Sequence, residues 1–254
     1  VPIALGTQTS ESIIRPAAFC GTIGFKPSYG SYPVEGIKAL GSTLDTLGAL
    51  TRCVDDLSLL HQVFTGDQLL QDGTARSALS LKLGVWLPPF GSPATDEDGL
   101  AMAIGKLRAA GVGVEPINLP ASFNELNEVH AELMAYEVVR NHVYECEPER
   151  EKLLGPRTKE VFDQGRAVSH EQYLVCRKAR REALAAFNEA VANFDAILVP
   201  AARGEAPLRS NGTGDPVFNR VWSLLGVPAL ALPVGLGQHD MPLAVQLVGC
   251  LDSD

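Results

Sequence analysis

Residues 6–30 read GTQTSESIIRPAAFCGTIGFKPSYG, and this stretch decides how the rest of the chain is interpreted. It passes from small polar residues, Gly6–Ser12, into a short apolar run, Ile13–Cys20, that ends at Gly21. The pattern predicts a loop followed by a short helix, because glycine is the usual residue just past a helix end. Glycines and turn residues recur through residues 1–50, which indicates short strands joined by loops that approach a ligand closely.

Ser12 is the candidate nucleophile of this stretch. The predicted helix begins directly after it, and the first N–H groups of a helix have no partner within the helix. Such N–H groups stabilise a negative oxygen, so a serine placed beside them can attack a carbonyl next to its own oxyanion hole. The plainer interpretation is that Ser12 only caps the helix. The local pattern leaves both interpretations open.

Hydrophobic periodicity predicts alternating strands and helices in the rest of the chain. Helices are predicted over residues 54–64, 95–110, 123–140, 170–193 and 216–226. Strands are predicted over 81–87, 112–117, 196–200, 228–233 and 243–249, and residues 65–80 are typical of a surface linker. The strand–helix–strand order across 81–117 favours a parallel α/β unit.

The stretch at 6–30 resembles the signature motif of the amidase signature family of serine hydrolases. That motif runs approximately G-T-x-T-[GA]-G-S-[IV]-x-x-P-A-[AS]-F-C-G-x-x-G-x-K-P-[ST]-x-G. The matching positions are Gly6, Thr7, Thr9, Ser12, Ile13, Pro16, Ala17, Phe19, Cys20, Gly21, Gly24, Lys26, Pro27, Ser28 and Gly30. The similarity continues in Leu44–Gly48, in Gly214–Trp222 and in Gln246–Gly249, so it spans nearly the whole chain.

The resemblance implies an α/β fold in which helices flank a mixed β-sheet. It also implies that residues 1–254 form part of one amidase signature domain that lacks its N-terminal portion. Within this domain we expect the nucleophile loop at 1–30, a helical region at 122–192 and the C-terminal strands at 196–249.

The resemblance also implies a catalytic unit of Ser, cis-Ser and Lys, in which a neutral lysine acts as base through a bridging serine. By position, Ser12 carries over as the nucleophile. The backbone N–H groups of Thr9, Ser10, Glu11 and Ser12 carry over as candidates for the oxyanion hole. The family chemistry implies no metal and no organic cofactor.

The chain departs from the family pattern in two places. The lysine and the loop with the bridging serine precede the nucleophile in the family, whereas eleven residues precede Ser12 here. We therefore expect the complete protein to be active and this chain alone to be inactive, because serine without a base is a weak nucleophile. The second departure is Glu11, which replaces a glycine and whose charge would oppose a developing oxyanion.

Arg15 allows two interpretations. It follows Ser12 by three residues, so it shares a helix face with the nucleophile and could bind a substrate carboxylate. The alternative is an internal salt bridge, for example to Asp45, which is otherwise expected to bond loop backbone. Asn219 and Trp222 are predicted to wall the acyl pocket, with plain packing as the alternative.

Composition restricts the partners. Hydrophobic residues make up 46% of the 254 residues and charged residues 20%, which excludes a disordered chain. The net charge of −9 disfavours nucleic-acid binding, and no apolar run is long enough to span a membrane. The five cysteines are odd in number and scattered, which suits a reducing, cytoplasmic compartment. We expect a small-molecule amide as the ligand and a possible homodimer.

The five histidines lie in helical or polar segments, and each is expected to be a surface or capping residue rather than a catalytic base or metal ligand. Three functions follow. The first is hydrolysis of linear carboxylic amides through an acyl-enzyme on Ser12. The alternatives are the amidase subunit of an amidotransferase that releases ammonia from glutamine, and a non-catalytic remnant or binding module.

Overall fold

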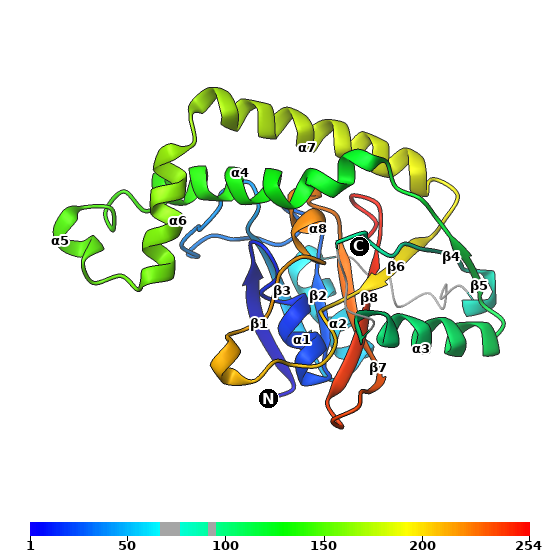
Figure 1. Cartoon of the computed structure of the whole chain (residues 1–254). Helices are drawn as coiled ribbons and strands as arrows, with labels where there is room; N and C mark the ends of the chain where they lie inside the picture. The colour runs from blue at the N-terminus through cyan, green and yellow to red at the C-terminus, as the bar shows by residue number, and fades with distance from the viewer. Residues whose placement is uncertain (67–76, 91–94) are drawn as a thin grey trace.

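The computed structural model describes residues 1–66, 77–90 and 95–254 (Figure 1). Within these ranges, eight strands form one sheet in the order β1-β3-β2-β7-β8-β6-β4-β5. The strands are β1 (Ile3–Gln8), β2 (Ile23–Lys26), β3 (Thr46–Thr51), β4 (Lys82–Val85), β5 (Gly113–Pro116), β6 (Ala196–Pro200), β7 (Ala229–Leu236) and β8 (Pro242–Val248). Strand β4 pairs in parallel with both β5 and β6, and the other pairings are antiparallel. The prediction of a mixed sheet is confirmed.

The helices cover both faces of this sheet. They are α1 (Ile14–Cys20), α2 (Val54–Thr65), α3 (Thr95–Ala109), α4 (Leu126–Asn141), α5 (Pro148–Glu151), α6 (Pro156–Ala167), α7 (His170–Val191) and α8 (Arg220–Leu225). The described residues also contain three short 3-10 turns, Ala78–Ser80, Ala121–Glu125 and Arg209–Asn211. The predicted parallel unit is β4–α3–β5.

Side-chain alternation along the strands divides the core into two faces. On β7, Ala229 and Ala231 join the large cluster formed with α1, α4, α7 and α8, whereas Leu230 and Leu232 pack with the cluster that contains Leu57 of α2. Successive residues of a strand point to opposite faces, so α1 and α2 lie on opposite sides of the sheet. Helix α3 packs on Leu198 and Val245 and lies on the same side as α2.

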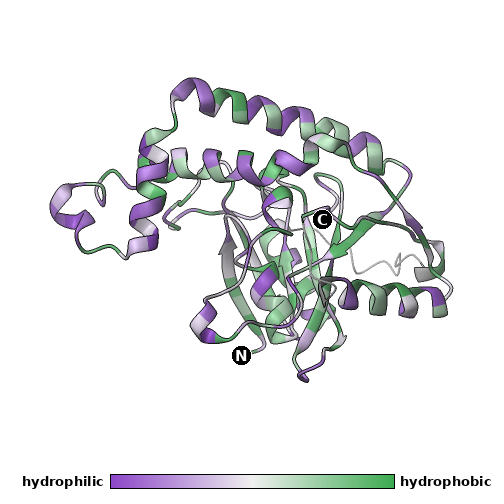
Figure 2. Ribbon diagram, in the orientation of Figure 1, coloured by the Kyte–Doolittle hydropathy of each residue, from purple (hydrophilic) through white to green (hydrophobic). Residues whose placement is uncertain are grey.

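Helices α4 and α7 lie side by side above one end of the sheet (Figure 1). Hydrophilic and hydrophobic residues alternate along α7, as expected for a helix with one buried face (Figure 2). The buried residues of α7 are Cys176, Ala183, Phe187 and Val191. Helices α4 to α7 lie within residues 122–192, the range that the sequence predicts to be helical.

Glycines allow α1 to lie directly on the sheet. A β-carbon at Gly48 in β3 would overlap the carbonyl oxygen of Phe25 and stand 2.8 Å from Cδ1 of Ile13. Helix α1 ends as predicted at Gly21, which has a left-handed φ of 64°. This close packing fixes the start of α1, and with it the residues that precede the helix.

Some predicted boundaries differ from the structure. The helix expected over 216–226 begins only at Arg220, and residues 217–219 before it form a turn. The helix expected from residue 123 opens with the 3-10 turn Ala121–Glu125. Most of the predicted linker at 65–80 lies outside the described residues. No helix of the described ranges is long and apolar enough to cross a membrane.

Candidate active site

The loop that carries Ser12, residues 9–13, connects strand β1 at the edge of the described sheet to helix α1. Ser12 is exposed, and its hydroxyl makes no hydrogen bond to any described residue. The N-cap residue of α1 is Ile13, and its apolar side chain accepts no hydrogen bond from the first turn of the helix. The interpretation of Ser12 as a helix cap is therefore wrong, and its hydroxyl is not engaged in holding the helix.

Gln8 takes over the capping. Its buried side-chain oxygen accepts hydrogen bonds from the N–H groups of Ile13 at 2.9 Å and of Ile14 at 3.0 Å. Its amide nitrogen donates to the hydroxyl of Ser223 on α8 at 3.0 Å. Gln8 thus satisfies N–H groups that a helix start otherwise leaves unpaired. This role of Gln8 was not predicted from the sequence.

Two peptide units of the loop are held by their carbonyl oxygens. Nε2 of His130 donates to the carbonyl oxygen of Thr9 at 2.9 Å, and the hydroxyl of Ser223 donates to that of Ser10 at 2.9 Å. A peptide unit is planar, so fixing its carbonyl also fixes the N–H of the following residue. Those N–H groups belong to Ser10 and Glu11.

The N–H groups of Ser10, Glu11 and Ser12 donate to no acceptor in the part of the chain that the structure describes. They lie on consecutive residues next to the exposed Ser12 hydroxyl. Unpaired, oriented N–H groups beside a nucleophile are the arrangement that stabilises a tetrahedral oxyanion. Thr9 forms hydrogen bonds through its carbonyl oxygen and its hydroxyl, and the role of its N–H in an oxyanion hole stays a prediction.

His130 is fully buried on α4, which corrects the expectation that each histidine is a surface or capping residue. Because Thr9 offers a carbonyl acceptor, Nε2 carries the proton, and the buried Nδ1 has no partner among the described residues. Burial lowers the pKa of His130 to about 4. The imidazole is therefore neutral near pH 7 and acts here as a hydrogen-bond donor.

Asp45 also supports the loop, through the side chain of Thr9. Its carboxylate accepts from the hydroxyl of Thr9 at 2.5 Å and from the N–H groups of Leu40 at 2.6 Å and Gly41 at 3.2 Å. The prediction that Asp45 bonds loop backbone is confirmed. Glu137 of α4 holds the same segment through the N–H and hydroxyl of Thr43, at 2.9 and 2.8 Å.

Arg15 forms an internal ion pair, but with Glu11 rather than with Asp45. Its guanidinium also donates to the carbonyl oxygen of Gly214 at 2.7 Å and to the hydroxyl of Thr213 at 3.0 Å. Burial raises the pKa of Glu11 to about 7, although the charge of Arg15 acts in the opposite direction. Glu11 does not adopt positive φ, so the backbone at this position does not require glycine.

Asn219 and Trp222 are buried on the α8 side of the core. The Asn219 amide donates to the carbonyl oxygen of Ala201 at 2.9 Å. The Trp222 ring packs against Trp86 and Phe187, with centroid distances of 5.7 and 5.5 Å. Their contact with a substrate stays a prediction.

All seven lysines lie in the described ranges, and none donates a hydrogen bond to Ser12. Lys26 is completely buried and donates to the carbonyl oxygens of Pro27 at 3.1 Å and Val227 at 2.5 Å, as expected for a structural residue. Burial lowers its pKa to about 7. No group of histidine, cysteine or acidic side chains suited to a metal ion occurs among the described residues.

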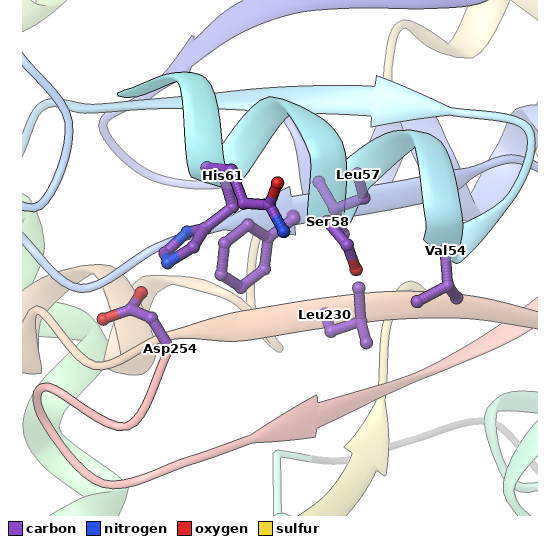
Figure 3. A pocket seen from close by; sticks show the side chains of 8 residues that line it. Val54, Leu57, Ser58, His61, Leu230 and Asp254 are labelled. Carbon is purple, nitrogen blue, oxygen red and sulfur yellow. The ribbon is translucent and has the colours of Figure 1, made fainter. Parts of the chain in front are cut away.

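A separate cavity of about 290 Å³ lies between α2 and the sheet (Figure 3). Leu57 and Leu230 line its apolar part, and His61 and Asp254 stand at one end. The cavity is on the face of the sheet that carries α2, whereas the loop that carries Ser12 leads into α1 on the other face. It is therefore distinct from the Ser12 site.

A family model described as Amidase matches residues 1–254. The chain belongs to the amidase family. Among curated amidase relatives, a subunit of the glutamyl-tRNA(Gln) amidotransferase of Picosynechococcus sp. is 28% identical, and the match covers 98% of this chain and 61% of that protein. The same subunit from Alkaliphilus metalliredigens is 30% identical, with 98% and 60% covered. The chain thus spans about three fifths of the length of these relatives.

Solved structures agree with the amidase assignment. A structure described as a crystal structure of amidase superposes with a TM-score of 0.84 at 29% identity, covering 99% of this chain and 59% of that one. The corresponding glutamyl-tRNA(Gln) amidotransferase subunit from Thermotoga maritima gives a TM-score of 0.78 at 23% identity, with 98% and 58% covered, and shows the shared fold.

Proposed function

We propose that Ser12 is the nucleophile of an amidase that hydrolyses the C–N bond of linear carboxylic amides. The observation that supports this most strongly is the exposed Ser12 hydroxyl beside the three unpaired N–H groups of Ser10, Glu11 and Ser12. The loop that presents them is fixed by Gln8, His130 and Ser223.

The proposed reaction proceeds through an acyl-enzyme. A base takes the Ser12 proton as the oxygen attacks the amide carbonyl, and the loop N–H groups bind the oxyanion that forms. The C–N bond then breaks, and the amine leaves with a proton returned by the base. Water attacks the resulting ester and releases the carboxylic acid.

The base is proposed to lie outside residues 1–254. Each of the seven lysines donates to, or pairs with, a group other than Ser12. In the family that the sequence resembles, the base is a lysine that acts through a bridging serine upstream of the nucleophile. The 254-residue chain alone is accordingly proposed to be inactive.

Release of ammonia and acid from a panel of linear amides tests this function in the full natural protein. Intact-protein mass spectrometry should reveal an acyl adduct, and Ser12→Ala should abolish both the adduct and turnover. The matched control is Ser122→Ala, which replaces an exposed serine outside the loop and should turn over normally. Unchanged turnover by Ser12→Ala would contradict the assignment.

Release of ammonia from glutamine within an amidotransferase is the second candidate, and it is favoured by the amidotransferase subunits among the curated relatives. Glutaminase activity that appears only when a partner protein is added would support it. Glutamine-independent hydrolysis of simple amides by the purified protein would argue for the first function.

A non-catalytic role is the third candidate, and Glu11 favours it because its carboxylate stands next to the nucleophile. Reaction of the full natural protein with a fluorophosphonate probe separates this role from the other two. Labelling of Ser12 that Ser12→Ala removes would reject the non-catalytic role, and absence of labelling would support it.

A further inference from the structure

Three groups of the fold already bind the guanidinium of Arg15. Glu11 pairs with it from one turn earlier, and the Gly214 carbonyl and Thr213 hydroxyl accept from its two terminal nitrogens. The side chains of Arg15 and Glu11 are only 11% and 10% exposed. A substrate carboxylate at Arg15 would compete with these three partners, and displacement of Glu11 would leave a buried carboxylate without its ion-pair partner.

Arg220 differs from Arg15 in this respect. It is the first residue of α8, and its side chain has no hydrogen-bond or ion-pair partner in residues 1–66, 77–90 and 95–254. Its Nε is buried and unpaired. A buried donor without an acceptor is unfavourable, so this group has the capacity to bind a water molecule or a ligand.

Arg220 also lies on the helix that holds the loop of Ser12. It lies three residues before Ser223, so the two share one face of α8, and Ser223 donates to the carbonyl of Ser10 in the loop. The positive charge of Arg220 also acts to lower the pKa of both Glu11 in the loop and His130, which binds the carbonyl of Thr9.

We propose that Arg220, and not Arg15, binds the carboxylate of an anionic amide substrate, because Glu11 holds Arg15 inside the fold. This proposal rests on the proposed amidase function and names the substrate class of that site. Arg220 provides a planar guanidinium that can bind a carboxylate through two hydrogen bonds. The Glu11–Arg15 pair then acts as a fixed part of the loop.

Steady-state kinetics of the full natural protein test the proposal with succinamate, which carries a carboxylate, and butyramide, which does not. Arg220→Lys should raise KM for succinamate by about tenfold or more, as expected for loss of a bidentate charged contact, and change KM for butyramide less than about twofold. The matched variant Arg15→Lys should affect both substrates alike. A selective effect of Arg15→Lys together with none of Arg220→Lys would overturn the proposal.

Calorimetric binding of succinate to the Ser12→Ala protein separates failure of this proposal from failure of the amidase function, because it requires no turnover. Binding that Arg220→Gln weakens at least tenfold, and that Arg15→Gln leaves in place, supports the role of Arg220 even if no amide is hydrolysed. Absence of binding, or binding that Arg220→Gln does not change, overturns it. Circular dichroism melting curves confirm that each variant is folded.

Discussion

His130 and Thr9 are joined by a 2.9 Å hydrogen bond between Nε2 and the carbonyl oxygen, although 121 positions separate them in the sequence. The bond connects the N-terminal half of α4 to the loop that carries Ser12. Because it fixes the peptide whose N–H belongs to Ser10, His130 is a positioning residue for the proposed oxyanion hole.

Replacing His130 by Ala should slow acylation of Ser12 by about tenfold or more, since loss of an oxyanion-hole donor itself typically costs about 10²–10³ in kcat. His130→Gln retains an N–H donor and should recover most of the rate. The measurement is kcat, with KM followed in parallel, because a misplaced N–H affects the transition state more than substrate binding. Equal kcat values for the Ala and Gln variants would contradict the positioning role.

Ser223→Ala should destabilise the protein by about 1–3 kcal/mol, because it leaves the Ser10 carbonyl and the Gln8 amide without partners. Urea unfolding of the variant and the parent protein provides the measurement. Ser122→Ala, at an exposed site, should stay within about 0.5 kcal/mol of the parent. A Ser223→Ala variant as stable as the control would refute the proposed bonding role.

Gly48→Ala should destabilise the fold strongly, by about 2 kcal/mol or more, since the added β-carbon would overlap the Phe25 carbonyl. Gly105→Ala is the matched control, because a β-carbon there meets nothing within 4 Å in the helix α3. That variant should gain about 0.5–1 kcal/mol from helix propensity. Thermal unfolding of both variants provides the measurement: the melting temperature should fall for Gly48→Ala and rise for Gly105→Ala.

The stability of the protein should depend on pH through Glu11. Burial raises the pKa of its carboxyl from 4.5 to about 7, so between these values the folded state binds more protons than the unfolded state. The contribution of this group is complete below about pH 4.5 and is lost as the pH rises through 7. Relative to Glu11→Gln, the parent protein should therefore lose stability between about pH 5 and pH 8 in urea titrations.

Glu149→Gln is the control for that titration, because the Glu149 side chain is 86% exposed and should give the same pH dependence as the parent. If the difference between the parent and Glu11→Gln stays constant across about pH 5 to pH 8, the carboxyl of Glu11 does not titrate as described. Arg15, Arg220, Arg157 and Asp215 are the charged groups that act on it.

Glu11→Gly should raise the hydrolysis rate of the full natural protein several-fold, because it removes a negative charge next to the developing oxyanion. Glu11→Gln separates charge from bulk: it should give most of the gain if charge is the cause. A Glu11→Gly variant with the parent rate would show that Arg15 already neutralises the carboxylate.

Local signals predicted much of the fold. The end of α1 at Gly21 and the strand Ala196–Pro200 agree with the expectations from the sequence, because a left-handed glycine and an apolar β-branched run are local features. The 3-10 turn before α4 was not predicted, because it follows the same periodicity as the helix. The cytoplasmic location and the homodimer stay predictions.

The candidate site was less predictable, since its supports come from distant segments. Gln8, His130 and Ser223 belong to three elements that only the tertiary fold brings together, and no local pattern marks them. The Glu11–Arg15 pair is different: its spacing of four residues on a helix start is a local signal for an ion pair, and it was available in the sequence.

The distances along the chain between Thr9, Ser10 and their partners have a consequence for biosynthesis. Asp45 follows Thr9 by 36 residues, His130 by 121, and Ser223 follows Ser10 by 213. Translation proceeds from the N-terminus, so the loop leaves the ribosome long before α8 exists. The loop that carries Ser12 therefore acquires its full set of supporting hydrogen bonds only after synthesis has passed Ser223.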